Sequence, residues 1–205
     1  MRSDSKSSGP TFTELARRRQ FVDCAIEVIA EQGFAAASLA KIAARAGTSK
    51  GVISYHFSGK DELLEQILLD VLADVVGFVE PAMAAATTAT EKLTAYLESG
   101  IEYMRLHRAQ LLALRQIFPN MRDADGNQRF VNEPGGARDR SIEEILTEGQ
   151  RTGEFRRFDP TVMAVTIRAA VDGVLDHWAM DPDLDLPAYT RELVSLFIHA
   201  TRGKT

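Results

Sequence analysis

The chain has 205 residues, of which 45% are hydrophobic and 26% are charged. This composition is typical of a globular protein with its own core, and it excludes a largely disordered chain. No stretch approaches the roughly 20 apolar residues of a membrane-spanning helix, and the first residues lack the apolar segment of a secretory signal, so we expect a cytoplasmic protein with no membrane partner. The single cysteine, Cys24, excludes a disulfide framework and a zinc site built from several cysteines.

The net charge of −5 is unevenly distributed along the chain. Residues 1–60 carry nine Lys or Arg and five Asp or Glu, a net charge of +4, whereas residues 61–205 carry fifteen and twenty-four, a net charge of −9. This asymmetry indicates a small basic module joined to a larger acidic body. A mildly basic module alone does not identify a nucleic-acid partner, because many cytosolic domains have one.

The predicted elements are helical along almost the whole chain. Residues 1–11 are rich in Ser, Gly and charge, so we expect a disordered tail. From Phe12 onward apolar residues recur at helical spacings, and no convincing strand pattern appears. We therefore predict an all-α protein of about nine helices, over residues 12–32, 39–45, 50–57, 60–79 (ended by Pro81), 91–118 (divided near His107), 137–151, 160–179 and 188–201, with a loop over 119–136.

Two short helices, 39–45 and 50–57, stand on either side of a tight turn at Gly47, with longer helices before and after them. This is the layout of a three-helix helix-turn-helix module, which we place at residues 12–59, followed by a body over residues 60–205. Ser38 and Ser49 are the expected N-caps of the short helices. Four apolar residues have the spacing to face inward and hold these helices together: Ile42, Ala43, Ile53 and Phe57.

The residues left on the outside of this module are hydroxyls, cations and a phenol, namely Ser38, Lys41, Ser49, Lys50, Tyr55, His56 and Lys60. Such groups bind DNA phosphates, together with the backbone N–H donors of helix N-termini. The alternative is that Lys50 is solvated, that Tyr55 and His56 pack within the module, and that the two serines only cap. Gly51 costs about 1 kcal/mol of helix stability relative to alanine, which a close approach of the backbone to DNA would explain.

Residues 38–64, SLAKIAARAGTSKGVISYHFSGKDELL, resemble the TetR family of bacterial transcriptional regulators, as do residues 12–64 more broadly. The matching pieces are Ala46-Gly47, Ser49-Lys50-Gly51, Tyr55-His56-Phe57 and Lys60-Asp61-Glu62-Leu63. The resemblance implies DNA binding by Ser38, Lys41, Thr48, Ser49, Lys50, Gly51, Val52, Ser54, Tyr55, His56 and Lys60. Thr48, Val52 and Ser54 differ from the residues usual in the family, so the preferred DNA sequence cannot be copied from a relative. Val52 is a candidate for contact with a thymine methyl group.

The resemblance also implies a homodimer, because in this family the last two long helices pair with those of a second copy. Here these helices are 160–179 and 188–201, and plain core is the alternative role for their apolar residues. The residues expected at the interface are Met163, Ile167, Ala170, Val171, Val174, Leu193, Leu196, Phe197 and Ala200. A two-fold dimer sets its recognition helices about 34–36 Å apart, which matches successive major grooves of a palindromic operator in double-stranded DNA.

The middle helices, residues 60–156, are expected to enclose a pocket for a small-molecule effector. Its candidate lining residues, each of which has core or surface as its alternative role, are Tyr103, Met104, His107, Arg115, Phe118, Phe155 and Trp178. Arg115 lies between Leu114 and Ile117, so we expect it to need a buried anionic partner. The identity of the effector is not indicated, and we expect no cofactor and no metal site.

The leading hypothesis is a homodimeric repressor that an effector releases from DNA, with the helix that begins at Lys60 as the lever. The alternative is an activator, or a regulator that answers to a protein partner instead of a small ligand. An enzyme is not supported, because the histidines at 56, 107, 177 and 199 have no metal-binding spacing. The run from Asp123 to Asn127 begins like a calcium loop, but Pro134 stands where that loop needs a glutamate.

Overall fold

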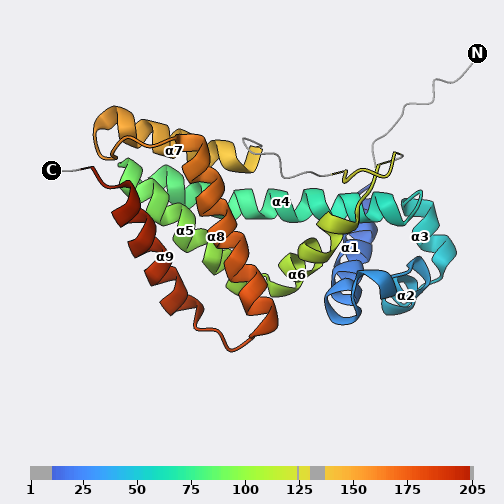
Figure 1. Ribbon diagram of the computed structural model, residues 1–205. Coiled ribbons are helices and arrows are strands. Elements are labelled where there is room, and N and C mark those ends of the chain that lie inside the picture. The colour runs from blue at the N-terminus through green and yellow to red at the C-terminus, as the bar shows by residue number, and fades with distance from the viewer. Residues whose placement is uncertain (1–10, 124, 130–136, 204–205) are drawn as a thin grey trace, which may run out of the picture. The chain divides into compact units, whose positions relative to one another are not determined.

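The computed structural model describes residues 11–123, 125–129 and 137–203. In these ranges the chain is all-α, as predicted, with nine α-helices and two short 3₁₀ turns (Figure 1). The helices are α1 (Phe12–Gln32), α2 (Leu39–Arg45), α3 (Lys50–His56), α4 (Lys60–Ala85), α5 (Ala89–Leu106), α6 (Arg108–Ile117), α7 (Ala137–Thr152), α8 (Pro160–Met180) and α9 (Leu186–Thr201). The 3₁₀ turns are η1 (Phe34–Ala36) and η2 (Phe118–Asn120). The tail predicted over residues 1–11 lies almost wholly outside the described residues, as do residues 130–136 of the predicted loop.

Several helix boundaries differ from the prediction, such as the start of α5 at Ala89 rather than 91, and two of the differences involve proline. The helix expected to end near Val79 continues to Ala85 with Pro81 inside it. A proline removes one backbone hydrogen bond, but the residues that follow it here are alanines and a methionine, which favour helix strongly. The last helix begins at Leu186 rather than 188, because Pro187 fits its first turn, where no N–H is needed.

Side-chain caps fix where several helices begin. Thr11 and Glu14 form a reciprocal capping box at the start of α1, and Thr88 and Glu91 form another at the start of α5. The predicted division near His107 is confirmed, since His107 leaves the helical conformation and separates α5 from α6. These caps satisfy backbone amides that the helices themselves cannot pair.

The chain forms two compact units. Unit 1 comprises residues 1–70 and 112–121, and unit 2 comprises residues 71–111 and 122–205. Two helices therefore pass from one unit to the other: α4 begins in unit 1 and ends in unit 2, and α6 begins in unit 2 and ends in unit 1. The boundary that we predicted at residue 60 stays a prediction.

Unit 1 is built around the apolar side of α1. Helices α2 and α3 both pack against α1 and against each other (Figure 1). The core of the unit consists of aromatic and aliphatic side chains, among them Phe21, Ala25, Ile29, Ile42, Ile53, Phe57, Leu63 and Ile67. The inward orientation predicted for Ile42, Ala43, Ile53 and Phe57 is confirmed, because all four are buried.

Unit 2 is a bundle in which α5 packs against α7, α8 and α9. Its apolar core includes Leu93, Leu97, Ile101, Ile142, Leu146, Ala164, Ile167, Val174 and Phe197. One ion pair lies within this core, because Arg168 of α8 donates from Nε to the Asp139 carboxylate of α7 over 2.5 Å. Among the described residues, no helix is both long and apolar enough to cross a membrane.

Candidate functional site

The turn between α2 and α3 has the geometry that a helix-turn-helix module needs. Gly47 has a φ of 64°, in the left-handed region that favours glycine. The backbone amide of Thr48 donates to the carbonyl of Ala43 over 2.9 Å, and the amide of Gly47 donates to Ala44 over 3.2 Å. These bonds close the end of α2 and direct the chain into α3.

Helix α3 has two unlike sides. Ile53 is completely buried against the rest of unit 1. The opposite side is exposed and carries a cation, a hydroxyl and a phenol, from Lys50, Ser54 and Tyr55. Tyr55 is 77% exposed although it is a large aromatic residue. An exposed row of hydrogen-bond donors on a helix that is fixed from behind has the chemistry to contact phosphates and base edges.

The two predicted N-caps behave differently. The Ser38 hydroxyl accepts a hydrogen bond of 3.3 Å from the amide of Lys41, so Ser38 caps α2 as predicted. Ser49 occupies the N-cap position of α3, but its hydroxyl makes no capping hydrogen bond. Ser49 is therefore the N-cap residue of α3 as predicted, although its side chain does not satisfy a backbone amide, and this exposed side chain stands next to Lys50.

The remaining predicted DNA-binding residues differ in exposure, and three of them, Lys60, His56 and Lys41, contact neighbouring residues. The Lys60 ammonium donates to the carbonyl of Phe34 over 3.2 Å and lies 4.3 Å from its ring centre, and burial lowers its pKa. The His56 ring lies 5.5 Å from that of Phe21. Lys41 donates to the Gln32 side chain over 3.1 Å. Gly51 is exposed, Val52 is 37% exposed and Thr48 is half-buried.

Sequence reasoning missed two long side chains that hold unit 1 together. Arg18 of α1 contacts the end of α3 and the first turns of α4. Gln116 of α6 hydrogen-bonds to the end of α1 and to η1. Both sets of contacts join residues at least 38 positions apart, so helical spacing contains no signal for them.

The seven predicted effector residues do not form one group. Tyr103 and His107 stack with ring centres 4.2 Å apart, and Phe78 of α4 meets Tyr103 edge-on at 5.5 Å. Trp178 lies under the guanidinium of Arg108 at 5.1 Å. Met104 is buried on α5. We call these six side chains, Phe78, Tyr103, Met104, His107, Arg108 and Trp178, the aromatic region of unit 2, and two of them, Phe78 and Arg108, were not predicted.

The other three candidates take no part in the ring contacts just described. Phe155 packs against Gly149 of α7, so closely that a β-carbon on Gly149 would overlap its ring. Arg115 and Phe118 belong to unit 1. The buried environment that we expected for Arg115 is wrong, because Arg115 is exposed. Helix α6 is amphipathic, and Leu114 and Ile117 take its buried side.

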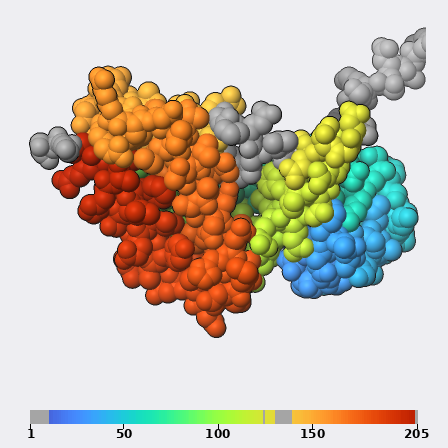
Figure 2. Space-filling model, in the orientation of Figure 1, coloured from blue at the N-terminus to red at the C-terminus, as the bar shows by residue number. Residues whose placement is uncertain are grey.

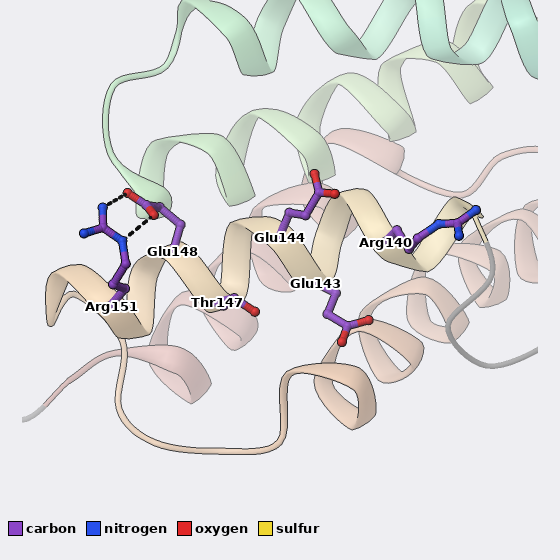
Figure 3. A pocket seen from close by; sticks show the side chains of 6 residues that line it. All are labelled: Arg140, Glu143, Glu144, Thr147, Glu148 and Arg151. Carbon is purple, nitrogen blue, oxygen red and sulfur yellow. Dashed lines mark hydrogen bonds and ion pairs between the residues drawn. The ribbon is translucent and has the colours of Figure 1, made fainter.

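Two surface hollows in unit 2 lie outside the aromatic region. The first, of about 520 Å³, is lined by six side chains of α7: Arg140, Glu143, Glu144, Thr147, Glu148 and Arg151 (Figure 3). Arg151 and Glu148 pair with each other there over 2.7 Å. Its charged lining does not suit an apolar ligand.

The second hollow, of about 550 Å³, lies on α9 and the loop before it. Its lining consists of Leu184, Asp185, Ala188, Tyr189, Glu192, Leu193 and Leu196. Leu193 and Leu196 were both predicted at the dimer interface. The surface of α8 and α9 faces the viewer in Figure 2.

Five of the nine predicted interface residues are buried within the single chain: Ile167, Val171, Val174, Leu193 and Phe197. They form the side of α8 and α9 that packs on the rest of unit 2, so they offer little surface to a partner. Leu196 is 60% exposed, and Met163, Ala170 and Ala200 are half-buried. Among the described residues, no three His, Cys, Asp or Glu side chains gather where they could hold a metal ion.

Comparison with known families and proteins covers almost the whole chain. Residues 21–67 match the family model described as bacterial regulatory proteins, tetR family, and residues 69–200 match the model described as YsiA-like protein, C-terminal region. The chain is 27% identical to the fatty acid metabolism regulator protein of Bacillus subtilis (strain 168) over 191 residues, which are 90% of this chain and 95% of that protein.

Two solved structures are similar to the whole fold. The fatty acid degradation regulator FadR from Bacillus halodurans has a TM-score of 0.78 and 25% identity, over 97% of this chain and 100% of that one. The transcriptional regulator FadR from Bacillus subtilis, solved in complex with stearoyl-CoA, has a TM-score of 0.77 and 25% identity, over 88% of this chain and 97% of that one.

Proposed function

This chain belongs to the TetR family of bacterial regulatory proteins, and we propose on that premise that it is a homodimeric repressor that a small-molecule effector releases from a palindromic operator. The observation that carries the proposal is the exposed polar side of α3, with Lys50, Ser54 and Tyr55 presented on a helix anchored by Ile53. Because the bacterial chromosome lies in the cytoplasm, a repressor of this kind acts there.

The DNA contacts that we propose combine phosphate binding with base readout. Ser38, Ser49 and Lys50 stand at or next to the N-termini of α2 and α3, where backbone N–H groups favour phosphate oxygens. Gly51, Val52 and Ser54 lie on the exposed part of α3, which would enter the major groove. Lys60 binds Phe34 in the free protein, so a phosphate contact by Lys60 requires that its side chain turn outward.

The dimer that we propose uses the outer surface of α8 and α9. Leu196 and Met180 are large apolar residues that one chain leaves exposed, and the hollow on α9 lies beside Leu196. Exposed apolar side chains beside a hollow are the features that a two-fold interface covers, because each copy places its side chains against the same surface of the other.

The effector that we propose is an acyl-coenzyme A. A similar regulator, FadR from Bacillus subtilis, was solved with stearoyl-CoA. In unit 2 of this chain, Phe78, Tyr103, Met104 and Trp178 are aromatic and apolar side chains that would move apart to admit an acyl chain, and Arg108 offers a cation for an oxygen-rich head group. Because α4 and α6 each pass between the two units, a rearrangement of either helix on binding would reach the DNA-binding module.

Fluorescence anisotropy tests the proposal with duplexes that tile the DNA upstream of the protein's own gene. We expect tight, salt-sensitive binding to one palindromic duplex, weaker binding by Lys50→Ala, and unchanged binding by Lys92→Ala, a lysine of α5 in unit 2. Adding stearoyl-CoA, but not free coenzyme A, should then release the duplex. No preference for any tile over random DNA would contradict operator binding at this locus, and no response to any acyl-CoA chain length would contradict the effector.

A further inference from the structure

We infer that Arg18 of α1 is a positioning residue for DNA recognition, which fixes the C-terminal end of α3 without itself contacting DNA. The inference rests on the DNA-binding function proposed above. Four contacts of one guanidinium carry it. Nη1 donates to the carbonyl of His56, and Nη2 donates to the carboxylate of Glu62 over 3.1 Å and to the side-chain oxygen of Gln66 over 3.2 Å. The guanidinium carbon lies 4.1 Å from the centre of the Phe57 ring.

The His56 carbonyl is one of the last in α3, and carbonyls at the end of a helix have no partner within that helix. Helix α3 has seven residues, which is too short to be stable without contacts from its surroundings. Arg18 supplies such a contact at the end of α3 where Tyr55 stands, and the Tyr55 and His56 rings meet edge-on at 5.1 Å. The position of Tyr55 therefore depends on how the last turn of α3 is held.

Glu62 extends the same cluster to the link between α3 and α4. The backbone amide of Ser58 donates to the Glu62 carboxylate over 2.7 Å, while the other carboxylate oxygen accepts from Arg18. The Ser58 amide and hydroxyl, followed by Arg18, hold the pKa of Glu62 below its usual range. The Arg18–Glu62 pair thus joins three segments of unit 1, namely α1, the end of α3 and the start of α4.

The geometry separates this role from a phosphate contact. The Arg18 side chain is 26% exposed, two of its guanidinium nitrogens donate within unit 1, and its face covers Phe57. A lysine cannot reproduce these contacts, because an ammonium has no planar face and no fork of donors. Arg19, the next residue, is more than half exposed and pairs with Asp23 on the same helix at 3.6 Å. Arg19 is therefore a matched control that removes the same charge from the same turn.

The first experiment measures the affinity of Arg18→Ala, Arg18→Lys and Arg19→Ala for the duplex that the wild-type protein selects from a random-sequence pool, over a range of salt concentrations. We expect Arg18→Ala to lose about tenfold in affinity, since one hydrogen bond of a charged group contributes free energy of that order. We expect Arg18→Lys to restore little and Arg19→Ala to lose little. The slope of log affinity against log salt should stay as in the wild type, because no phosphate contact is removed.

Two results would overturn the inference, because either makes Arg18 a phosphate ligand. One is a slope of log affinity against log salt that is smaller in magnitude by about 0.9, the value for one phosphate, and the other is full rescue by Arg18→Lys.

The second experiment needs no DNA and so separates failure of this inference from failure of the proposed function. Hydrogen exchange of Arg18→Ala should be faster at residues 53–58 and unchanged at residues 39–45. If Arg18→Ala unfolds unit 1 altogether, Glu62→Gln serves in its place, with the same local pattern expected. Unchanged exchange at residues 53–58 in the folded variant would overturn the inference, whatever the DNA shows.

Discussion

The side-chain oxygen of Gln116 accepts a hydrogen bond of 2.8 Å from the backbone amide of Phe34, a residue 82 positions earlier in the chain. The amide nitrogen of the same side chain donates to the carbonyl of Ile29 over 3.2 Å. One glutamine of α6 thus bonds to the last turn of α1 and to the residue after Gly33, the position where α1 ends and φ is 86°. Since α6 begins in unit 2 and ends in unit 1, Gln116 is one point at which the end of that helix is hydrogen-bonded to the rest of unit 1.

We predict that Gln116→Ala destabilises the protein by about 1–3 kcal/mol, because the half-buried amide of Phe34 loses its partner. Urea unfolding followed by circular dichroism measures this change, with Gln110→Ala on the same helix as the control. We also expect stearoyl-CoA to release less of the duplex from the variant than from the wild-type protein. A variant as stable as Gln110→Ala would show that water replaces the glutamine without cost.

The sequence predicted much of this fold because its signals are local. Gly47, Ser38 and the spacing of Ile42 and Ile53 each act within a few residues, and the structure confirms the elements they predict. The resemblance then added the family. Pro81 shows where a local rule fails, because α4 continues through the proline to Ala85.

The site was harder to predict because it depends on contacts between distant residues. Nothing within α1 indicates that Arg18 reaches the carbonyl of His56, and nothing within α6 indicates that Gln116 reaches Phe34. Apart from Arg115, whose apolar neighbours suggest a role, the effector candidates depend on residue type. Type does not separate Tyr103, which stacks on His107, from Phe155, which fills the space beside Gly149.

We predict that Leu196→Glu converts a dimer into a monomer with unchanged helix content. Leu196 is 60% exposed in the single chain, so a charge there does not disturb its core, but it would be desolvated in the interface that we propose. Sedimentation velocity across a concentration series measures the change. The control is Leu106→Glu, which places the same charge at a 51% exposed leucine of α5. If both variants sediment like the wild type, α9 is not the interface.

We predict that Arg168→Met is strongly destabilising, by about 3–5 kcal/mol, because it leaves the carboxylate of Asp139 buried without its cation. Asp139 is 1% exposed, and Arg168 also pairs with Asp172 over 3.2 Å. The double variant Arg168→Met/Asp139→Asn should recover part of the loss, since it removes the buried charge as well. Chemical unfolding of the three proteins measures both steps. A double variant less stable than the single one would show that the pair is not coupled in this way.

We predict that Glu91 makes the protein more sensitive to acid. The Thr87 hydroxyl and the amides of Thr87 and Thr88 donate to its carboxylate, which lowers its pKa from 4.5 to about 2. A carboxyl whose pKa is lower in the folded state stabilises that state above pH 4.5, and this contribution is lost as the pH falls towards 2. The free energy of unfolding of Glu91→Gln should therefore lie below that of the wild type at pH 7 and approach it at pH 3. Glu98→Gln on the same helix is the control, and a gap of constant size would contradict the prediction.

We predict that Gly51→Ala stabilises the free protein while weakening its binding to DNA. A β-carbon at Gly51 would meet only the Ser49 hydroxyl, at 3.8 Å, so the protein itself has room for alanine. Alanine in place of glycine within a helix favours folding by about 0.5–1 kcal/mol. Calorimetry should therefore give a higher melting temperature, and anisotropy a lower affinity for the selected duplex, because the methyl group keeps the backbone of α3 away from DNA. Gly47→Ala is the contrasting variant, since its φ of 64° strains alanine and should lower the melting temperature. A Gly51→Ala protein that is more stable and binds DNA as well as the wild type would place this turn of α3 away from the DNA, and Lys50 would then act from the edge of the interface.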